Sequence, residues 1–186
     1  MSKWNTTKLL VIGGLAALNA VFNILGAIFS ATFVLGAGGL INGFFDGMLF
    51  VFCCLLIRKF GAATIMGFIF SICVLPLPVL GPSGFLLKII IGTLTGLIID
   101  IIYVLLKRNE MFAVIIIGIG QGIIINIGVI GSGLLFSVPG IKEAVKLSLF
   151  PLSLVVFPLI GGVGGYVGYL LFKSLRNTSI IKRIQA

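Results

Sequence analysis

The chain contains no histidine and few acidic residues. Among its 186 residues there are four Asp or Glu, against 13 Lys or Arg. Histidine is the usual general base and a common metal ligand, and no two acids form a pair on one predicted helix. The sequence also has no HExxH and no GxxxxGK[ST] motif. These absences argue against an enzyme, and we expect no metal site and no cofactor.

Charged residues of either sign are scarce. They make up 9% of the chain, hydrophobic residues make up 60%, and the mean hydropathy is +1.33. Soluble domains carry about a quarter charged residues, so this composition indicates an integral protein of the cell membrane. The net charge of +9 lies in short loops and tails beside hydrophobic segments. We attribute this charge to membrane topology and to contact with the lipid bilayer, not to nucleic acid.

Cysteine and tryptophan are also few. The three cysteines, Cys53, Cys54 and Cys73, lie inside predicted spans, and two of them are adjacent in sequence. This pattern suits neither a disulfide framework nor a metal site. The single tryptophan, Trp4, precedes the first hydrophobic segment, where an interfacial anchor belongs. A ligand site built on stacked tryptophans is therefore excluded.

Six hydrophobic segments are separated by charges, prolines and glycines. A helix that crosses a bilayer needs roughly 20 residues, so most of these segments are long enough. We predict one all-α integral membrane domain over residues 1–186, a six-transmembrane-helix bundle. The third segment is the shortest, because Pro76 and Pro78 interrupt its end. The predicted spans are Leu9–Phe29, Leu35–Ile57, Ala62–Val79, Phe85–Leu106, Phe112–Phe136 and Leu147–Phe172.

Lysine and arginine are unevenly distributed over the predicted loops. Ten lie on one side, which the positive-inside rule makes cytoplasmic, and this side holds both termini. The outer loops are then Ser30–Val34, Leu80–Gly84 and Ser137–Lys146. In the last of these, residues 141–146 form a short amphipathic piece, which is either a cover over the outer mouth or an ordinary connector. The ten basic residues are Lys3, Lys8, Arg58, Lys59, Lys107, Arg108, Lys173, Arg176, Lys182 and Arg183.

Ionisable residues inside the predicted spans mark a candidate site, because they are costly in a bilayer and by default indicate a site or pathway. Asp46 lies near the middle of the second span, and Lys88 lies about one turn into the fourth. Either the two form a pair or hold a ligand, or Lys88 extends outward and Asp46 is hydrogen-bonded for structure or neutral. Asp100 lies close to Lys107 and Arg108, and we interpret it as an anchor at the interface.

Five amide side chains lie at middle or outer depth in the predicted spans: Asn19, Asn23, Asn42, Gln121 and Asn126. Asn and Gln present both donors and acceptors, as recognition of a small heterocycle or amide-bearing ligand requires. Each can equally be a hydrogen-bonding contact between helices. The candidate substrate-binding residues are Asn23, Asn42, Asp46, Lys88, Gln121 and Asn126.

Small residues recur at helical spacing. On the first segment, Ala16, Ala20, Asn23 and Ala27 fall on one stripe, which predicts a contact face and not a lipid face. Pairs with GxxxG spacing occur in the fourth, fifth and sixth segments and predict close helix packing. These pairs are Gly92 with Gly96, Gly118 with Gly122, and Gly161 with Gly165.

The chain resembles the S component, the substrate-binding membrane subunit, of an energy-coupling factor (ECF) vitamin transporter. The resemblance covers the chain in length, span count and cytoplasmic termini. Its most specific motif is Ala16-Ala17-Leu18-Asn19-Ala20, which matches the AxxxA of the family's first helix. The junction Arg58-Lys59-Phe60-Gly61-Ala62-Ala63-Thr64 is similar to the IRKxGAA of S components linked to thiamine precursors.

This resemblance implies a subunit that captures a small vitamin or vitamin precursor from the outside. In the family, a transmembrane T component and two ABC ATPases drive toppling of the S component, which releases the vitamin inside. Ala16 and Ala20 would be the coupling face toward the T component, and Ser30–Val34 would cap the pocket. The implied pocket residues are Lys88, Gln121 and Asn126, with Asn42 and Asp46 as further contributors.

Two departures from the family restrict the substrate. The sequence lacks the Met-His start of the cobalt and nickel versions and the Trp-rich site of the thiamine binders. What is left is a small vitamin or precursor, for example a pyrimidine. Two other functions stay open. One is a stand-alone secondary permease or channel-like protein that uses Asp46 as a proton or cation site, and the other is a ligand-free membrane assembly protein.

Overall fold

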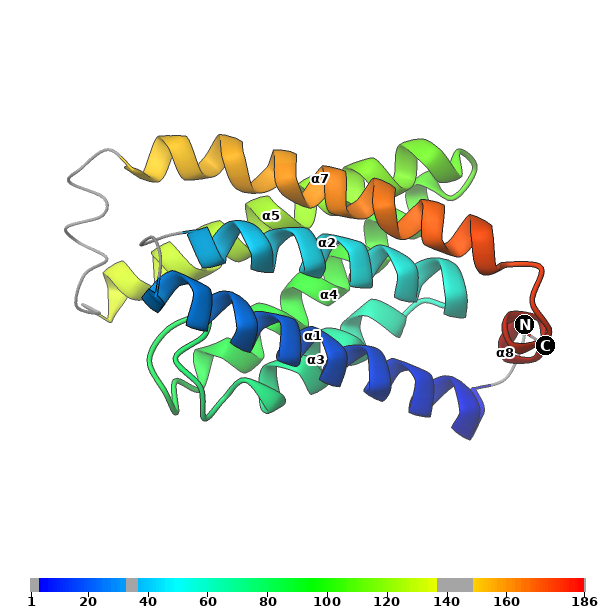
Figure 1. Ribbon diagram of the computed structural model, residues 1–186, viewed down its shortest axis with the longest axis horizontal. Coiled ribbons are helices and arrows are strands. Elements are labelled where there is room, and N and C mark those ends of the chain that lie inside the picture. The colour runs from blue at the N-terminus through cyan, green and yellow to red at the C-terminus, as the bar shows by residue number, and fades with distance from the viewer. Residues whose placement is uncertain (1–3, 33–36, 137–148, 186) are drawn as a thin grey trace.

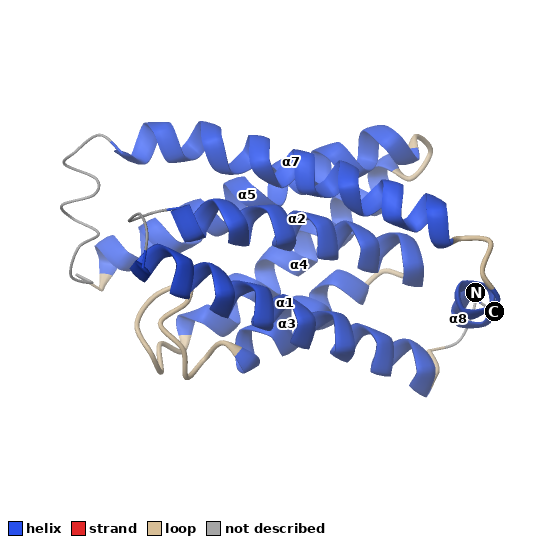
Figure 2. Cartoon of the chain, viewed as in Figure 1, coloured by secondary structure: helices blue, strands red, loops and turns tan. Residues whose placement is uncertain are grey.

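The computed structural model describes residues 4–32, 37–136 and 149–185, and in these ranges it contains helices and no strands (Figure 2). Five of the helices are long and apolar enough to cross a membrane. The predicted all-α class is confirmed, and the helices are compatible with a membrane bundle. They are α1 (Thr6–Thr32), α2 (Ala37–Ile57), α3 (Ala62–Cys73), α4 (Leu87–Leu106), α5 (Glu110–Leu135), α7 (Leu149–Leu175) and α8 (Ser179–Gln185).

Several predicted features fall outside these ranges. The amphipathic piece at residues 141–146 lies outside the described residues, as do residues 33 and 34 of the first predicted outer loop. The other residues of that loop, 30–32, form the end of α1. Helix α1 therefore extends three residues beyond Phe29, the predicted end of the first span.

The long helices run side by side along the longest axis of the molecule, with α2 in the middle (Figure 1). Helix α2 packs against α7, α1 and α5, whereas α3 packs mainly against α4 and α1. The short helix α8 lies across the end of the bundle at which α1 begins. Its Gln185 side chain donates hydrogen bonds to the carbonyl oxygens of Leu55 and Leu56, at 3.2 and 3.3 Å, near the end of α2.

Helix α3 is much shorter than the predicted span Ala62–Val79. It has 12 residues, about 18 Å at 1.5 Å per residue, and ends at Cys73, before Pro76 and Pro78. A bilayer core is about 30 Å thick, so α3 alone cannot cross it. Residues 74–86 continue as turns and irregular backbone. The ends of this helix therefore need hydrogen-bond partners that a longer span would find in its own backbone.

Asp100 supplies those partners at the N-terminus of α3, which corrects its predicted role as an interface anchor. Its side chain is buried on α4 and accepts hydrogen bonds from the backbone N–H groups of Ala63 at 3.2 Å and Thr64 at 2.9 Å. The Thr64 hydroxyl donates a third, at 2.7 Å. A carboxylate is favourable at a helix N-terminus, because the N–H groups of the first turn point toward it. Asp100 thus joins α4 to the start of α3.

Glycines bring the helices into backbone contact. A Cβ atom added to Gly118 on α5 would overlap the carbonyl oxygen of Gly161 on α7, and one added to Gly47 on α2 would overlap the same oxygen. Gly67 on α3 and Gly92 on α4 meet in the same way. The close packing predicted from the GxxxG spacings is therefore confirmed at α4, α5 and α7.

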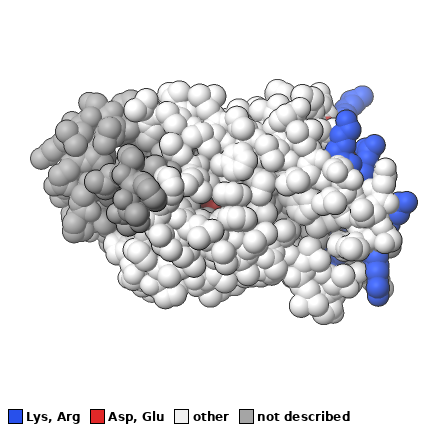
Figure 3. Space-filling model, viewed as in Figure 1, with Lys and Arg blue, Asp and Glu red and all other residues white. Residues whose placement is uncertain are grey.

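The Lys and Arg side chains gather at one end of the visible surface, where α8 and the start of α1 lie (Figure 3). Here Arg58 pairs with Glu110, at 2.8 Å, and the Lys59 ammonium lies 5.0 Å from the centre of the Trp4 ring. Cation–π contacts of this kind suit an interfacial position. The uneven charge distribution seen in the sequence is thus a property of one end of the bundle.

Gly118→Ala is expected to lower the free energy of unfolding by about 1–3 kcal/mol, because the added methyl group would overlap the Gly161 carbonyl oxygen. Gly131→Ala on the same helix is the matched control, since a Cβ there meets nothing within 4 Å. Alanine should stabilise this control by roughly 0.5–1 kcal/mol through helix propensity. Equal thermal unfolding midpoints of the two variants in one detergent would contradict the contact.

Candidate ligand-binding cavity

A cavity of about 690 Å³ lies between α1, α2, α5 and α7, with the irregular segment after α3 as a further wall. Its volume is in the range of small-molecule sites, roughly 300–1,000 Å³. The helix residues around it come from the half of each helix that is remote from the Lys- and Arg-rich end. Five of the six candidate binding residues line it: Asn23, Asn42, Asp46, Gln121 and Asn126.

Asp46 is the buried acidic group of the cavity, with 2% of its surface exposed. Its carboxylate accepts a hydrogen bond from the Asn23 side-chain N–H at 2.8 Å and one from the Gln121 side-chain N–H at 3.4 Å. The Asn23 amide nitrogen also donates to the Asn19 carbonyl oxygen at 3.0 Å. The carboxylate of α2 is thus bound by amides from α1 and α5, and three helices meet at one polar centre.

The other two amides of the cavity belong to Asn126 and Asn42. The Asn126 side-chain oxygen accepts a hydrogen bond from the Ser153 hydroxyl of α7 at 3.4 Å. Asn42 lies against Gly26 of α1, where a Cβ atom would overlap its side-chain oxygen. Glycine at position 26 therefore makes room for an amide between α1 and α2.

Four of these side chains retain buried polar atoms that have no hydrogen-bond partner among the described residues. They are Asn23 Oδ1, Asn42 Oδ1, Gln121 Oε1 and Asn126 Nδ2. Buried polar atoms in folded proteins are nearly always satisfied, and leaving one unpaired costs about 1–3 kcal/mol. Both amide atoms of Asn19, which does not line the cavity, are also unpartnered, so four of the six such atoms in the described residues belong to cavity residues.

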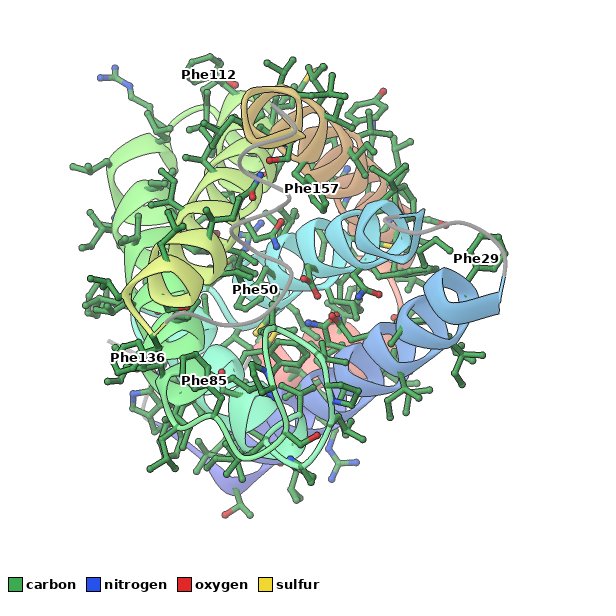
Figure 4. The ribbon with its side chains drawn as sticks, turned by 90° about the vertical axis from the view of Figure 1, so that its left-hand side faces the viewer. Phe29, Phe50, Phe85, Phe112, Phe136 and Phe157 are labelled. Atoms are coloured by element: carbon green, nitrogen blue, oxygen red, sulfur yellow. The ribbon has the colours of Figure 1, made fainter. Side chains whose placement is uncertain are left out.

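Apolar side chains form the rest of the cavity wall. Phe157 of α7 lies on the inner side of the ring of helices (Figure 4) and lines the cavity with Ile125, Val129 and Val79. A Cβ atom on Gly39 would come within 2.7 Å of the Phe157 ring, so the small residues of α2 create the space that the ring occupies. Phe157 is not among the predicted site residues, because nothing in the sequence distinguishes one phenylalanine of a hydrophobic span from another.

Lys88 does not reach the cavity, which corrects its predicted role as a pocket residue or partner of Asp46. It is fully buried at the start of α4, and its ammonium group donates hydrogen bonds to the carbonyl oxygens of Val74 at 3.3 Å, Leu75 at 3.5 Å and Leu77. These carbonyls follow the C-terminus of α3. A cation is favourable at this end of a helix, as a carboxylate is at the other.

The segment that Lys88 binds is the irregular wall of the cavity. Residues 78–81 line the cavity directly, and the backbone N–H of Gly84 donates to the Leu75 carbonyl at 2.8 Å. Gly81, with a φ of +119°, adopts a conformation that favours glycine. At the far end of the segment the Phe85 ring meets the Phe136 ring of α5 edge to face, 5.8 Å between centres (Figure 4). Lys88 is therefore a positioning residue for this wall.

Ala16 and Ala20, the predicted coupling face, lie inside the bundle. Their exposed fractions are 0% and 6%, and both belong to the hydrophobic core between α1 and its neighbours α2 and α3. In this arrangement their contacts are with the chain's own helices, and the coupling role stays a prediction. The exposed side of α1 instead carries Leu10, Val21 and Leu25. The stripe of small residues is a contact face, as predicted, but its partner is the same chain.

No protein family model, curated protein or solved structure matches the chain. The cavity and the residues around it are therefore the basis for an argument about function.

Lys88→Met is expected to lower the thermal unfolding midpoint by several degrees, because carbonyls that lose a buried donor cost about 1–3 kcal/mol each. Lys107→Met, which removes an exposed lysine at the far end of α4, is the control and should unfold like the wild type. If both variants keep the wild-type midpoint, Lys88 does not anchor the cavity wall.

Proposed function

We propose that this chain is a membrane-embedded binding protein for a small molecule, and that it acts as the S component of an ECF-type importer for a vitamin or vitamin precursor. The observation that carries the proposal is the cavity, in which a buried carboxylate and four amides from three helices face an apolar wall. An assembly protein whose amides only join helices does not need such a space. The ECF assignment itself comes from the sequence resemblance.

The position of the cavity favours uptake from the outside. It lies in the half of the bundle remote from the Lys- and Arg-rich end, which the positive-inside rule assigns to the cytoplasm. A ligand would therefore enter from the external side. Release to the cytoplasm then requires a large movement of the protein, which a T component and two ABC ATPases would drive.

A stand-alone secondary permease is the second candidate, and one observation favours it. Asp46 is buried in the predicted second span, and the described residues that line the cavity include no Lys or Arg. Such a carboxylate is suited to binding a proton or cation that is transported with the substrate. The two candidates share the cavity and differ in the source of energy.

Ile125→Trp is expected to fill the cavity and abolish retention of a small molecule by the purified protein. Ile127→Trp is the matched control, because Ile127 lies two residues away on α5 and is 53% exposed. Native mass spectrometry of protein purified in mild detergent measures the bound mass. If both variants retain the ligand equally, the ligand binds outside the cavity. If wild-type protein purified from cells grown in several media retains no ligand, the binding function is contradicted.

The energy source is tested by uptake in cells. If the chain is an S component, uptake of the retained molecule needs a co-produced T component and its ATPases, and a protonophore that leaves ATP intact has no immediate effect. Uptake that continues without the ATPases but stops with the protonophore would establish the permease instead. Catalytically inactive ATPases of the same module are the control.

A further inference from the structure

The hydrogen bonds to Asp46 fix the direction in which its neighbouring amides point. Asn23 and Gln121 each turn their N–H groups toward the carboxylate, so their carbonyl oxygens must point away from it. Both side chains are at least 99% buried, and both oxygens are without a partner among the described residues. The acid at this position therefore fixes the orientation of both amides, with a nitrogen of each toward α2.

The inner part of the cavity presents the Asp46 carboxylate. The unpartnered oxygens of Asn42 and Gln121 lie against Gly26 of α1 and Gly161 of α7, so they belong to contacts between helices. A carboxylate suits a group that carries several N–H donors. A carboxylate or phosphate ligand would instead meet the negative charge of Asp46.

The charge of Asp46 is not balanced by a cation of the described chain. The cavity lining contains no basic residue, the only ion pair within the described ranges joins Arg58 to Glu110, and Lys88 binds carbonyl oxygens. Two amides donate to this carboxylate, but a buried negative charge that no cation neutralises is still costly, and a bound cation offsets that cost. A ligand with a positive charge next to Asp46 would therefore gain both hydrogen bonds and charge neutralisation.

The size and walls of the cavity favour an organic molecule over a bare ion as the ligand. About 690 Å³ is far more than one ion and its first hydration shell need. The Phe157 ring and the side chains of Ile125 and Val129 give the cavity an apolar part. This part matches the carbon skeleton of an organic molecule.

We propose that the cavity selects small organic cations, in which a protonated amine or amidinium binds Asp46 and the apolar part lies against Phe157 and Ile125. This inference rests on the proposed binding function and names the ligand class that the function would serve. It also assigns a role to Asp46 beyond joining α1, α2 and α5.

Three probes of nearly equal size and shape test the charge requirement: benzamidinium, neutral benzamide and anionic benzoate. Each is titrated against purified wild-type protein in a neutral detergent, with the shift in thermal unfolding midpoint as the readout. Benzamidinium is expected to bind about tenfold or more tightly than benzamide, with benzoate weakest, because charge-assisted hydrogen bonds are the stronger ones. Equal binding of all three, or preference for benzamide or benzoate, would overturn the proposal.

Two variants locate the effect. Asp46→Asn, which preserves side-chain size, should remove the difference between benzamidinium and benzamide. Glu110→Gln removes an acid outside the cavity, at the Arg58 pair, and should leave the difference unchanged. If Asp46→Asn does not fold, the preference for benzamidinium over benzamide is compared between the wild type and the cavity-filling variant Ile125→Trp. Preference that survives Ile125→Trp would place the cation elsewhere and contradict the assignment.

Sodium chloride at increasing concentration, with choline chloride at equal ionic strength, separates an inorganic from an organic cation. Stabilisation by sodium alone that depends on Asp46 and excludes benzamidinium would assign the site to a metal cation and overturn the organic class. Native mass spectrometry separates this proposal from the proposed function. A retained neutral or anionic metabolite that Ile125→Trp releases would refute the cation selectivity and leave the binding function intact.

Discussion

Helix α3 is too short to cross a bilayer, so the backbone groups at its two ends need hydrogen-bond partners. Side chains of α4 supply these partners at both ends of α3. Asp100 accepts hydrogen bonds from N–H groups at the start of α3, and Lys88 donates to carbonyls just beyond its last turn. The two residues are 12 positions apart on α4, about 18 Å, which equals the length of the 12-residue α3. Unpaired backbone groups are expensive in a bilayer, so this match decides where a non-helical segment can be placed.

That segment becomes a wall of the cavity, and the remaining walls depend on a different kind of contact. Glycines allow α7 to approach α2 and α5 until backbones touch, for example at Gly161, which meets both Gly47 and Gly118. Farther from the Lys- and Arg-rich end, the side chain of Phe157 and the amides near Asp46 lie between the helices. The cavity therefore lies beside these backbone contacts, and Gly122 of its lining itself meets the Phe157 carbonyl.

Much of the candidate site could be predicted from the cost of polar groups in a membrane. That cost singled out Asp46 and the amides Asn23, Asn42, Gln121 and Asn126, and all five line one cavity. The same cost singled out Lys88, which lies elsewhere, because a buried ammonium can be satisfied by backbone carbonyls as well as by an acid. Phe157 could not be predicted, since its role depends on the glycines of another helix.

The sequence by itself determined the class of protein, the helical state and the concentration of basic residues at one end, because composition, hydrophobic length and charge are properties of the chain alone. The tertiary structure decided which helix faces contact one another. Ala16 and Ala20 form a contact face in either case, but only packing shows that α2 and α3 occupy it. Likewise Asp100 and Lys88 are ionisable residues of one hydrophobic segment, and their joint role exists only because α3, between them in space, is the same length.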